Sequence, residues 1–357
     1  MKGNGILIGM NNLFVPLLLF VPIAIWASFT GISPVVLFFL CALAIVPLAK
    51  FIGEATEELA TRTSPAVGGL LSATFGNATE LIIGLLALHA GLIDVVKASI
   101  TGSIIGNLLL VLGLAMFAGG WKREKQTFNK TGVLAGGSTL LLGTVALVMP
   151  AIFFQTAPGV SAPVVENLSV WVALVLIVMY GANLLFSLHT HKHLYFEEAG
   201  KYEPRWSLGQ AVLTLLASTL AVAWVSDILV GSINPLVTQL GWSQLFVGVI
   251  FIAIIGNAAE NFSAILVALK NRMDLSLQIT IGSATQIGMC VAPILVFASL
   301  FLGQPMNLVF NTFELMAMVL AVFIVNFILQ DGESNWLEGA QLLAAYVIMG
   351  IAFFFHP

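Results

Sequence analysis

Charged residues are scarce in this chain of 357 residues. They make up 8% of the sequence, hydrophobic residues make up 59%, and the mean hydropathy is +1.04, whereas a soluble domain carries about 25% charged residues. This scarcity excludes a soluble fold. The apolar runs are continuous over about 18–25 residues and do not alternate with polar positions, so they predict helices that span a lipid bilayer rather than the strands of a β-barrel.

Several functional signatures are also missing. The two cysteines, Cys41 and Cys290, lie in separate apolar runs, so we interpret them as packing residues rather than as a redox pair. No phosphate-binding glycine loop occurs, so any energy-driven process here would draw on an ion gradient rather than on a nucleotide. No His-Glu-x-x-His motif or paired catalytic Asp lies within an apolar run, which argues against an intramembrane enzyme. We expect no cofactor and no nucleic-acid partner.

The apolar runs predict an all-α protein with about eleven transmembrane helices. Their approximate limits are 13–30, 33–53, 65–91, 95–118, 131–152, 168–188, 207–232, 244–269, 275–302, 307–329 and 335–355. The first run resembles a signal peptide, but Trp26 stands in the candidate cleavage region, where small residues are required. We therefore expect this helix to be retained.

Positive charges predict the orientation. With a cytoplasmic N-terminus, twelve of the thirteen Lys and Arg residues flank the spans on the inside, and Lys97 alone lies outside. This asymmetry predicts an integral membrane protein whose N-terminus is cytoplasmic. The short N-terminus favours a prokaryotic inner membrane. The sequence leaves the oligomeric state open.

A five-residue string occurs twice. Gly76-Asn77-Ala78-Thr79-Glu80 returns 180 residues later as Gly256-Asn257-Ala258-Ala259-Glu260. At the same offset, Val67-Gly68 matches Val247-Gly248, Asp94 matches Asp274, and Gly102-Ser103 matches Gly282-Ser283. Because the two copies lie five spans apart, they must cross the membrane in opposite directions. This is the inverted repeat of secondary transporters, which bind their substrates near the midplane between the repeats.

The repeat divides the chain into four parts. We predict an N-terminal helix over 1–32, a first five-helix repeat over 33–188, a cytoplasmic connecting segment over 189–206, and a second five-helix repeat over 207–357.

Glu80 and Glu260, one in each copy of the string, are the strongest site candidates. A carboxylate at membrane depth costs several kcal/mol unless it is paired or protonated. Two carboxylates form a hard oxygen site that suits a divalent ion such as Ca²⁺. When the ion leaves, two neighbouring negative charges favour protonation, so exchange of Ca²⁺ for H⁺ follows from the same pair. The alternative is a structural pair of glutamates that bridges helices by hydrogen bonds.

Other polar residues of the two repeats accompany the glutamates. Gly76 and Gly256 permit close backbone approach or local unwinding. Asn77 and Asn257 lie on the same helical face as the glutamates and offer amide oxygens. A second repeated element contributes Asn107, Gln286, Ser103 and Ser283, which either line the site or form interhelical hydrogen bonds.

Acidic residues elsewhere have simpler interpretations. Asp94 and Asp274 are predicted helix N-caps. Glu54, Glu57 and Glu58 form either a cation-attracting vestibule or a solvated loop. The segment with His189, His191, His193, Glu197, Glu198 and Glu203 favours a solvated loop over a metal cluster. It could still sense protons or cations and regulate transport.

The repeated motifs, GNATELIIG at 76–84 and GNAAEN at 256–261, resemble those of the calcium/proton antiporters, the cation/proton exchanger branch of the calcium/cation antiporter superfamily. The resemblance covers nearly the whole chain. It implies an eleven-span transporter that exports Ca²⁺ against H⁺ entry and binds the cation between Glu80 and Glu260, helped by Asn77, Asn257, Asn107 and Gln286. Glu197, Glu198 and Glu203 correspond to the family's acidic segment. Ser72, Gly106 and Asn261 depart from the family pattern, which often has Asn, Ser and His there.

Two rival functions stay open. A sodium/calcium-type exchanger more often carries an additional carboxylate where this chain has Gln286. A divalent cation channel usually builds its pore from rings of residues related by subunit symmetry, which a repeat within one chain does not provide.

Overall fold

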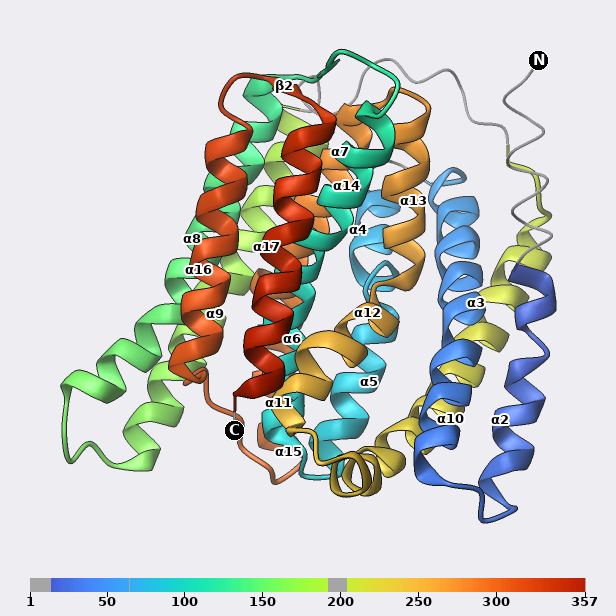
Figure 1. Ribbon diagram of the computed structural model, residues 1–357, viewed down its shortest axis with the longest axis vertical. Helices are drawn as coiled ribbons and strands as arrows, with labels where there is room; N and C mark the ends of the chain where they lie inside the picture. The colour runs from blue at the N-terminus through green and yellow to red at the C-terminus, as the bar shows by residue number, and fades with distance from the viewer. Residues whose placement is uncertain (1–13, 64, 192–203, 357) are drawn as a thin grey trace.

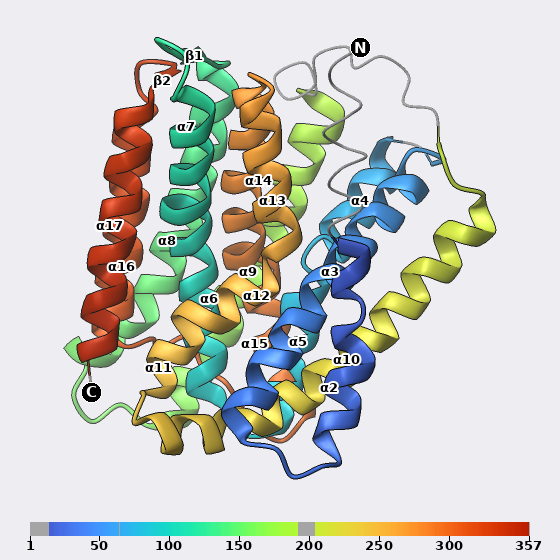
Figure 2. The ribbon, with the colours of Figure 1, turned by 45° about the vertical axis from the view of Figure 1, so that its right-hand side comes forward.

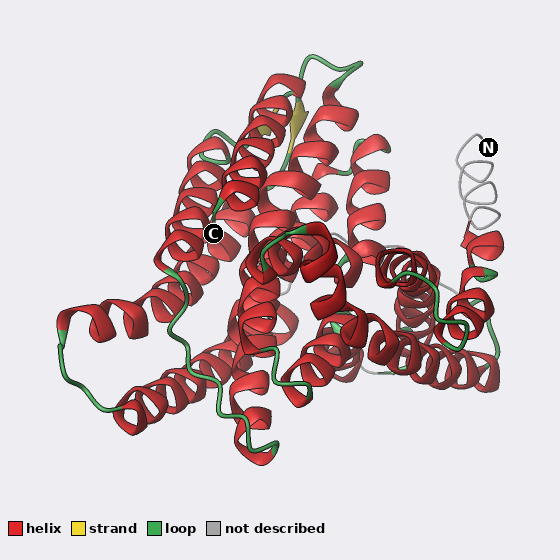
Figure 3. Cartoon of the chain, turned by 60° about the horizontal axis from the view of Figure 1, so that its bottom comes forward, coloured by secondary structure: helices red, strands yellow, loops and turns green. Residues whose placement is uncertain are grey.

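The computed structural model describes residues 14–63, 65–191 and 204–356. Nearly all of this part of the chain is helical (Figure 3). Its two strands, β1 (Gln126–Thr127) and β2 (Glu333–Ser334), form one short antiparallel pair. The predicted all-α class is therefore confirmed.

The first half contains α2 to η2, where η denotes a π-helical segment. The bounds are α2 Phe20–Ser28, α3 Pro34–Ala60, α4 Pro65–Phe75, α5 Ala78–His89, α6 Ile93–Ile105, η1 Gly106–Val111, α7 Leu112–Gly120, α8 Lys130–Thr156, α9 Ala162–Leu185 and η2 Phe186–Thr190.

The second half contains α10 to α17. The bounds are α10 Leu208–Leu240, α11 Gln244–Phe246, η4 Val247–Ile252, α12 Ala253–Gly256, α13 Ala258–Leu269, α14 Met273–Gln286, η5 Ile287–Val291, α15 Ala292–Phe301, α16 Thr312–Ile328 and α17 Trp336–Phe355.

Many of these helices are suited to a bilayer. Among the described residues, seven are long and apolar enough to cross a membrane, or eight if Gln244–Gly256 and Ala258–Leu269, bent by 63° relative to each other, form one span. Phe14–Ser28, Ala78–His89 and Thr312–Ile328 are apolar but shorter. The polytopic membrane fold is thus confirmed, and the count of eleven spans stays a prediction.

The predicted caps at Asp94 and Asp274 are wrong. The N-cap positions of α6 and α14 are Leu92 and Arg272, and the two aspartates lie in the first helical turn instead. A carboxylate there still faces the positive end of the helix dipole. The Asp274 carboxylate also accepts a hydrogen bond from the backbone N–H of Asn129, so it connects the start of α14 to the start of α8.

Glu54, Glu57 and Glu58 do not lie in a loop, because α3 continues to Ala60. Glu58 is buried and accepts hydrogen bonds from the backbone N–H groups of Arg205 and Trp206, both at 3.0–3.2 Å. Glu54 pairs with Lys50 at 3.3 Å. The Glu58 carboxylate therefore connects the end of α3 to the chain entering α10, which is a structural role rather than that of a solvated loop.

Two groups of helices make up the molecule. Figure 2 shows α2, α3 and α10 inclined against the remaining helices, and α3 and α10 pack extensively on each other. Elsewhere, the spans Ile93–Gly120 and Met273–Phe301 have 78% and 61% of their apolar windows buried, against 44% or less for the other long helices. These two spans carry the second polar element of each repeat, so that element lies at the centre of the protein.

The two copies of the repeated string interrupt helices that run in opposite directions. In Figure 1 the chain descends from α4 into α5, whereas it rises from α11 through α12 into α13. Both interruptions lie near mid-height. This is the inverted arrangement that an offset of five spans predicts, because five is odd.

Candidate cation site

The repeated string ends one helix and starts another in each half. Asn77 and Asn257 precede α5 and α13, with backbone angles of φ −101°, ψ 24° and φ −87°, ψ 8°. Glu80 and Glu260 lie in the first turn of these helices. Each carboxylate therefore lies at the positive end of the helix that follows the break, where the helix dipole interacts favourably with negative charge.

The two halves meet through their glutamates and glycines. A Cβ added to Gly256 would lie 2.8 Å from Glu80 Cγ and 3.5 Å from Glu80 Oε1, and one added to Gly76 would lie 3.4 Å from Glu260 Oε1. Each glutamate thus lies against the motif glycine of the other half. Glycine is required at 256 because any side chain there would displace Glu80.

Asn257 is the centre of a hydrogen-bond network between the halves. Its Nδ2 donates to Ser103 Oγ at 2.8 Å and to the Ala253 carbonyl at 2.9 Å. Its Oδ1 accepts from Asn107 Nδ2 at 3.0 Å, and Asn107 Nδ2 also lies 3.1 Å from Ser283 Oγ. Ser283 Oγ in turn donates to Asn257 Oδ1 at 3.3 Å and lies close to Glu260. The structure therefore brings Asn257, Asn107, Ser103 and Ser283 together beside Glu260.

Asn77 has a different partner. Its Nδ2 donates to Gln286 Oε1, which joins the break before α5 to the end of α14. This bond occupies the Asn77 nitrogen and leaves its oxygen without a donor. All eight polar residues that the sequence selects are thus engaged at the contact between the two halves, together with Gly76 and Gly256.

Several buried oxygens at this contact have no hydrogen-bond donor among the described residues. They are both carboxylate oxygens of Glu80, Oε2 of Glu260, and Oδ1 of Asn77, Asn107 and Asn261. An unpartnered buried acceptor costs about 1–3 kcal/mol. The ion pairs of the described chain, Lys50–Glu54 and Lys125–Glu333, involve none of these groups. A cluster of oxygens with two carboxylates fits a hard divalent cation, or protons on the carboxylates.

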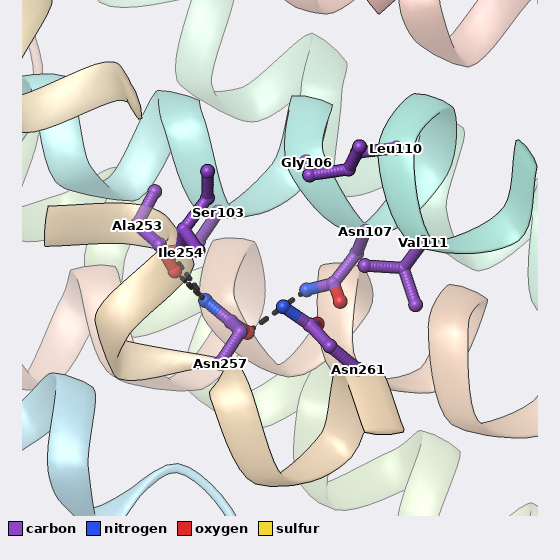
Figure 4. Close-up of a pocket in the computed structure, with 9 residues that line it drawn as sticks. All are labelled: Ser103, Gly106, Asn107, Leu110, Val111, Ala253, Ile254, Asn257 and Asn261. Carbon is purple, nitrogen blue, oxygen red and sulfur yellow. Dashed lines mark hydrogen bonds between the residues drawn. The ribbon is translucent and has the colours of Figure 1, made fainter. Parts of the chain in front are cut away.

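A small pocket adjoins this network (Figure 4). Its polar lining consists of Ser103, Asn107, Asn257 and Asn261, and its remaining lining residues are Gly106, Leu110, Val111, Ala253 and Ile254. Neither glutamate is among these residues; Asn107 and Asn257 connect the pocket to Glu260 through Ser283.

Asn261 joins the candidate site, although its sequence context does not predict this. Its oxygen is buried without a donor, and the residue lines the pocket. The sequence marks it only as a departure from the family pattern. The available signal is its place directly after Glu260, where an amide in an apolar run needs a polar partner.

The proposed regulatory residues Glu197, Glu198 and Glu203 lie outside the described residues, as does His193. His189 lies in the last turn of the π-helical segment η2, and the His191 ring stacks on Phe186 with 4.1 Å between the ring centroids. Among the described residues, no group of three or more His, Cys, Asp or Glu side chains could hold a metal ion.

The sequence profile of the sodium/calcium exchanger protein family matches residues 33–189 and 210–355. These ranges cover most of the chain, so the protein belongs to this family.

Similar proteins indicate to which branch of the family the chain belongs. The chain is 46% identical to a Ca²⁺/H⁺ antiporter of Aphanothece halophytica, with 98% of each chain covered. It is 48% identical to a Ca²⁺/H⁺ antiporter of a Synechocystis strain, with 97% of this chain and 98% of the relative covered. The solved structure of native YfkE is 43% identical and superposes with a TM-score of 0.85 over 96% of this chain and all of that one. The chain therefore falls in the calcium/proton antiporter branch, among transporters rather than enzymes.

Proposed function

We propose that this protein exchanges Ca²⁺ for H⁺ across a membrane, and that both ions use one site built from Glu80 and Glu260. The observation that carries the proposal is the cluster of buried, donor-less oxygens where the two inverted halves meet. The names of the relatives support the choice of ions.

The ligand set supports a calcium site. Ca²⁺ takes 6–8 oxygen ligands from carboxylates, amides, backbone carbonyls and water. Glu80 and Glu260 supply the charge, and Asn77, Asn107 and Asn261 each hold an amide oxygen without a donor. Asn257, Gln286, Ser103 and Ser283 hold these groups in place through hydrogen bonds.

The same two carboxylates explain the coupling. One divalent cation or two protons would neutralise them, so a loaded site crosses the low-dielectric centre at little cost. The empty, doubly charged site costs several kcal/mol at that depth. Alternating access with a site that moves only when loaded gives exchange without leakage.

The sequence also supports a proposed membrane orientation and a division of the chain into parts. Twelve of the thirteen Lys and Arg residues flank the spans on one side, which supports a cytoplasmic N-terminus and export of Ca²⁺ against H⁺ entry. We place the protein in a prokaryotic inner membrane. We divide it into the N-terminal helix 1–32, the repeats 33–188 and 207–357, and the connecting segment 189–206, whose acidic residues are proposed regulators.

Calcium flux into inverted membrane vesicles under an imposed pH gradient, with and without sodium, tests this function. The proposal predicts flux that needs no sodium and that reverses with the pH gradient. Flux that requires sodium would indicate the sodium/calcium-type alternative, and calcium movement without proton counterflow would indicate a channel.

A further inference from the structure

Two loops meet at the end of the molecule that carries β1 and β2. Figure 2 shows the ends of α7 and α13 next to each other at this end. Arg123, in the loop between α7 and α8, donates a hydrogen bond to the Leu269 carbonyl at 3.0 Å. Gln126, in the same loop, donates to the Ala268 carbonyl at 3.0 Å and to Asn271 Oδ1 at 3.1 Å. These hydrogen bonds hold the α7–α8 loop against the turn between α13 and α14.

The contact between these loops brings exposed basic residues together. The bond from Arg123 to Leu269 places the adjacent lysines of the two loops near each other. The bond from the Asn129 N–H to the Asp274 carboxylate does the same for the basic residues at the starts of α8 and α14. We call these four exposed residues the basic loop surface; they are Lys122, Lys130, Lys270 and Arg272.

The carboxylates at this end leave the basic loop surface unpaired. Glu333 pairs with Lys125 at 2.6 Å, and Glu124 is exposed in the α7–α8 loop. Backbone N–H groups donate hydrogen bonds to the carboxylates of Asp274, Asp331 and Glu338. Neither of the two ion pairs in the described part of the chain involves a residue of the basic loop surface. Four exposed positive charges are therefore available to an anion.

Two exposed tryptophans adjoin these loops. Trp121, directly before Lys122, is 61% exposed, and Trp336, the first residue of α17, is 44% exposed. Their rings pack edge to face with centroids 5.8 Å apart, and Trp121 also packs on Phe117 at 5.1 Å. Exposed tryptophans of membrane proteins gather at the level of the lipid headgroups. The pair therefore places the neighbouring basic residues at the height of the lipid phosphates.

We propose that the basic loop surface binds the headgroup of an anionic phospholipid. Lys and Arg side chains donate charge-assisted hydrogen bonds to phosphate oxygens, and basic pockets between transmembrane helices bind anionic headgroups. The proposed orientation places this end of the molecule at the cytoplasmic leaflet, which carries a negative surface charge. The exposed aromatic pair beside the charges suits a ligand that has an acyl chain as well as a phosphate.

The location of the surface gives the lipid an effect on the protein. The two loops that a headgroup would contact connect α7 to α8 and α13 to α14. Helix α13 carries Glu260 in its first turn, and α14 carries Ser283 and Gln286. A bound lipid therefore stabilises, from one end, the helices that support the candidate cation site. Lipid binding here does not depend on which ions the protein exchanges.

Lipid retention measured by native mass spectrometry tests the surface directly. Purified protein in detergent, mixed with equal amounts of phosphatidylglycerol and phosphatidylcholine, should retain phosphatidylglycerol preferentially. The double variant Lys270→Gln with Arg272→Gln should lower this preference by about tenfold or more, because each basic residue near an anionic lipid surface contributes about fivefold. The matched control is Lys125→Gln, which removes a charge that Glu333 already pairs and should keep the preference. Equal retention of the two lipids by the wild type, or an unchanged preference in the double variant, would overturn the proposal.

Thermal unfolding in detergent distinguishes a lipid from a free anion. Phosphatidylglycerol should raise the melting temperature of the wild-type protein, because a ligand that binds the folded state stabilises it. Inorganic phosphate at the same concentration should leave the melting temperature unchanged, and so should phosphatidylcholine. Equal stabilisation by inorganic phosphate would mean that the surface binds a free anion, which contradicts a lipid site.

Both measurements are made without calcium, so they separate the lipid surface from the proposed ion exchange. If the wild-type protein retains phosphatidylglycerol preferentially but transports no calcium, the lipid surface stands and the proposed function fails. If calcium is exchanged for protons and the two lipids are retained equally, the function stands and the lipid surface fails.

Discussion

Glu80 and Glu260 occupy matching places in the two halves, in the first turn of α5 and of α13, whereas the amides around them are arranged differently. Asn257 bonds to Asn107 and Ser103, but its counterpart Asn77 bonds to Gln286. The sequence explains the difference, because the repeat offset pairs Gln286 with Gly106 and pairs Asn107 with Ile287.

This comparison separates the parts of the site that repeat from those that do not. Each half supplies one glutamate and one glycine, and each glutamate lies against the glycine of the other half. The proposed site needs both glutamates, because two negative charges balance one divalent cation. The amides only need to supply oxygens and hold the two breaks together, and different residues can do this on the two sides. We therefore expect equal effects from the two glutamates and unequal effects from the glycines and asparagines.

The largest effect should come from the glutamates. Glu80→Gln or Glu260→Gln keeps the side-chain shape but removes a negative charge and a proton-binding group. Losing a charged buried ligand costs about 3 kcal/mol, so we expect calcium-driven proton movement in proteoliposomes to fall by about 100-fold or more. The two variants should fail alike and remain folded by size-exclusion chromatography. Near-normal exchange in either one would rule out the two-carboxylate mechanism.

The glycines should give a smaller and unequal effect. Alanine at 256 would place a Cβ 2.8 Å from Glu80 Cγ, whereas alanine at 76 would place one 2.5 Å from the Ser72 carbonyl oxygen and 3.4 Å from Glu260 Oε1. We expect Gly256→Ala to weaken calcium binding by about tenfold, because it displaces a carboxylate. We expect Gly76→Ala to lower the melting temperature more than Gly256→Ala does, because its clash is with the backbone. Isothermal titration with Ca²⁺ and thermal unfolding in detergent measure the two effects. Unchanged calcium affinity in Gly256→Ala would mean that Glu80 does not lie against Gly256.

The asparagines should affect stability more than chemistry. Asn257→Ala removes the partner of both Asn107 and Ser103, and leaving such groups unpaired costs about 1–3 kcal/mol. Asn77→Ala removes only the bond to Gln286. Thermal unfolding in detergent should therefore show a larger loss of melting temperature for Asn257→Ala. Equal losses would indicate that the asymmetric network does not hold the halves together.

Much of this architecture is readable from the sequence. Long apolar runs predict where the helices lie. The rare polar residues inside them, such as the repeated Asn and Glu, are functional candidates because burying them in a membrane is costly. The offset of five spans between the copies, an odd number, also predicts their opposite directions. The meeting of Glu80 with Gly256 could not be read from the pattern, since it depends on how the two halves pack.

The sequence-based predictions that are wrong have physical causes. Glu54, Glu57 and Glu58 look like a loop by charge, but the surrounding Ala, Leu and Glu residues favour helix, and α3 continues through them. Asp94 and Asp274 look like caps by residue type, yet the N-cap positions, Leu92 and Arg272, each lie two residues earlier. The different positions of α4 and α11–η4 could not be predicted from the Val-Gly pair that they share, because the same sequence pattern packs in two different ways.

The central claim is that calcium and protons compete for the same two carboxylates, and proton release on calcium binding tests it most directly. Calcium would be added to purified protein in weakly buffered detergent solution, and the released protons counted between about pH 6 and pH 8. Because the cation requires ionised ligands, the account predicts proton release that grows as the pH is lowered, with affinity falling in parallel. Glu80→Gln and Glu260→Gln should abolish the release. Calcium binding of unchanged affinity across this range, with no protons released, would contradict the account.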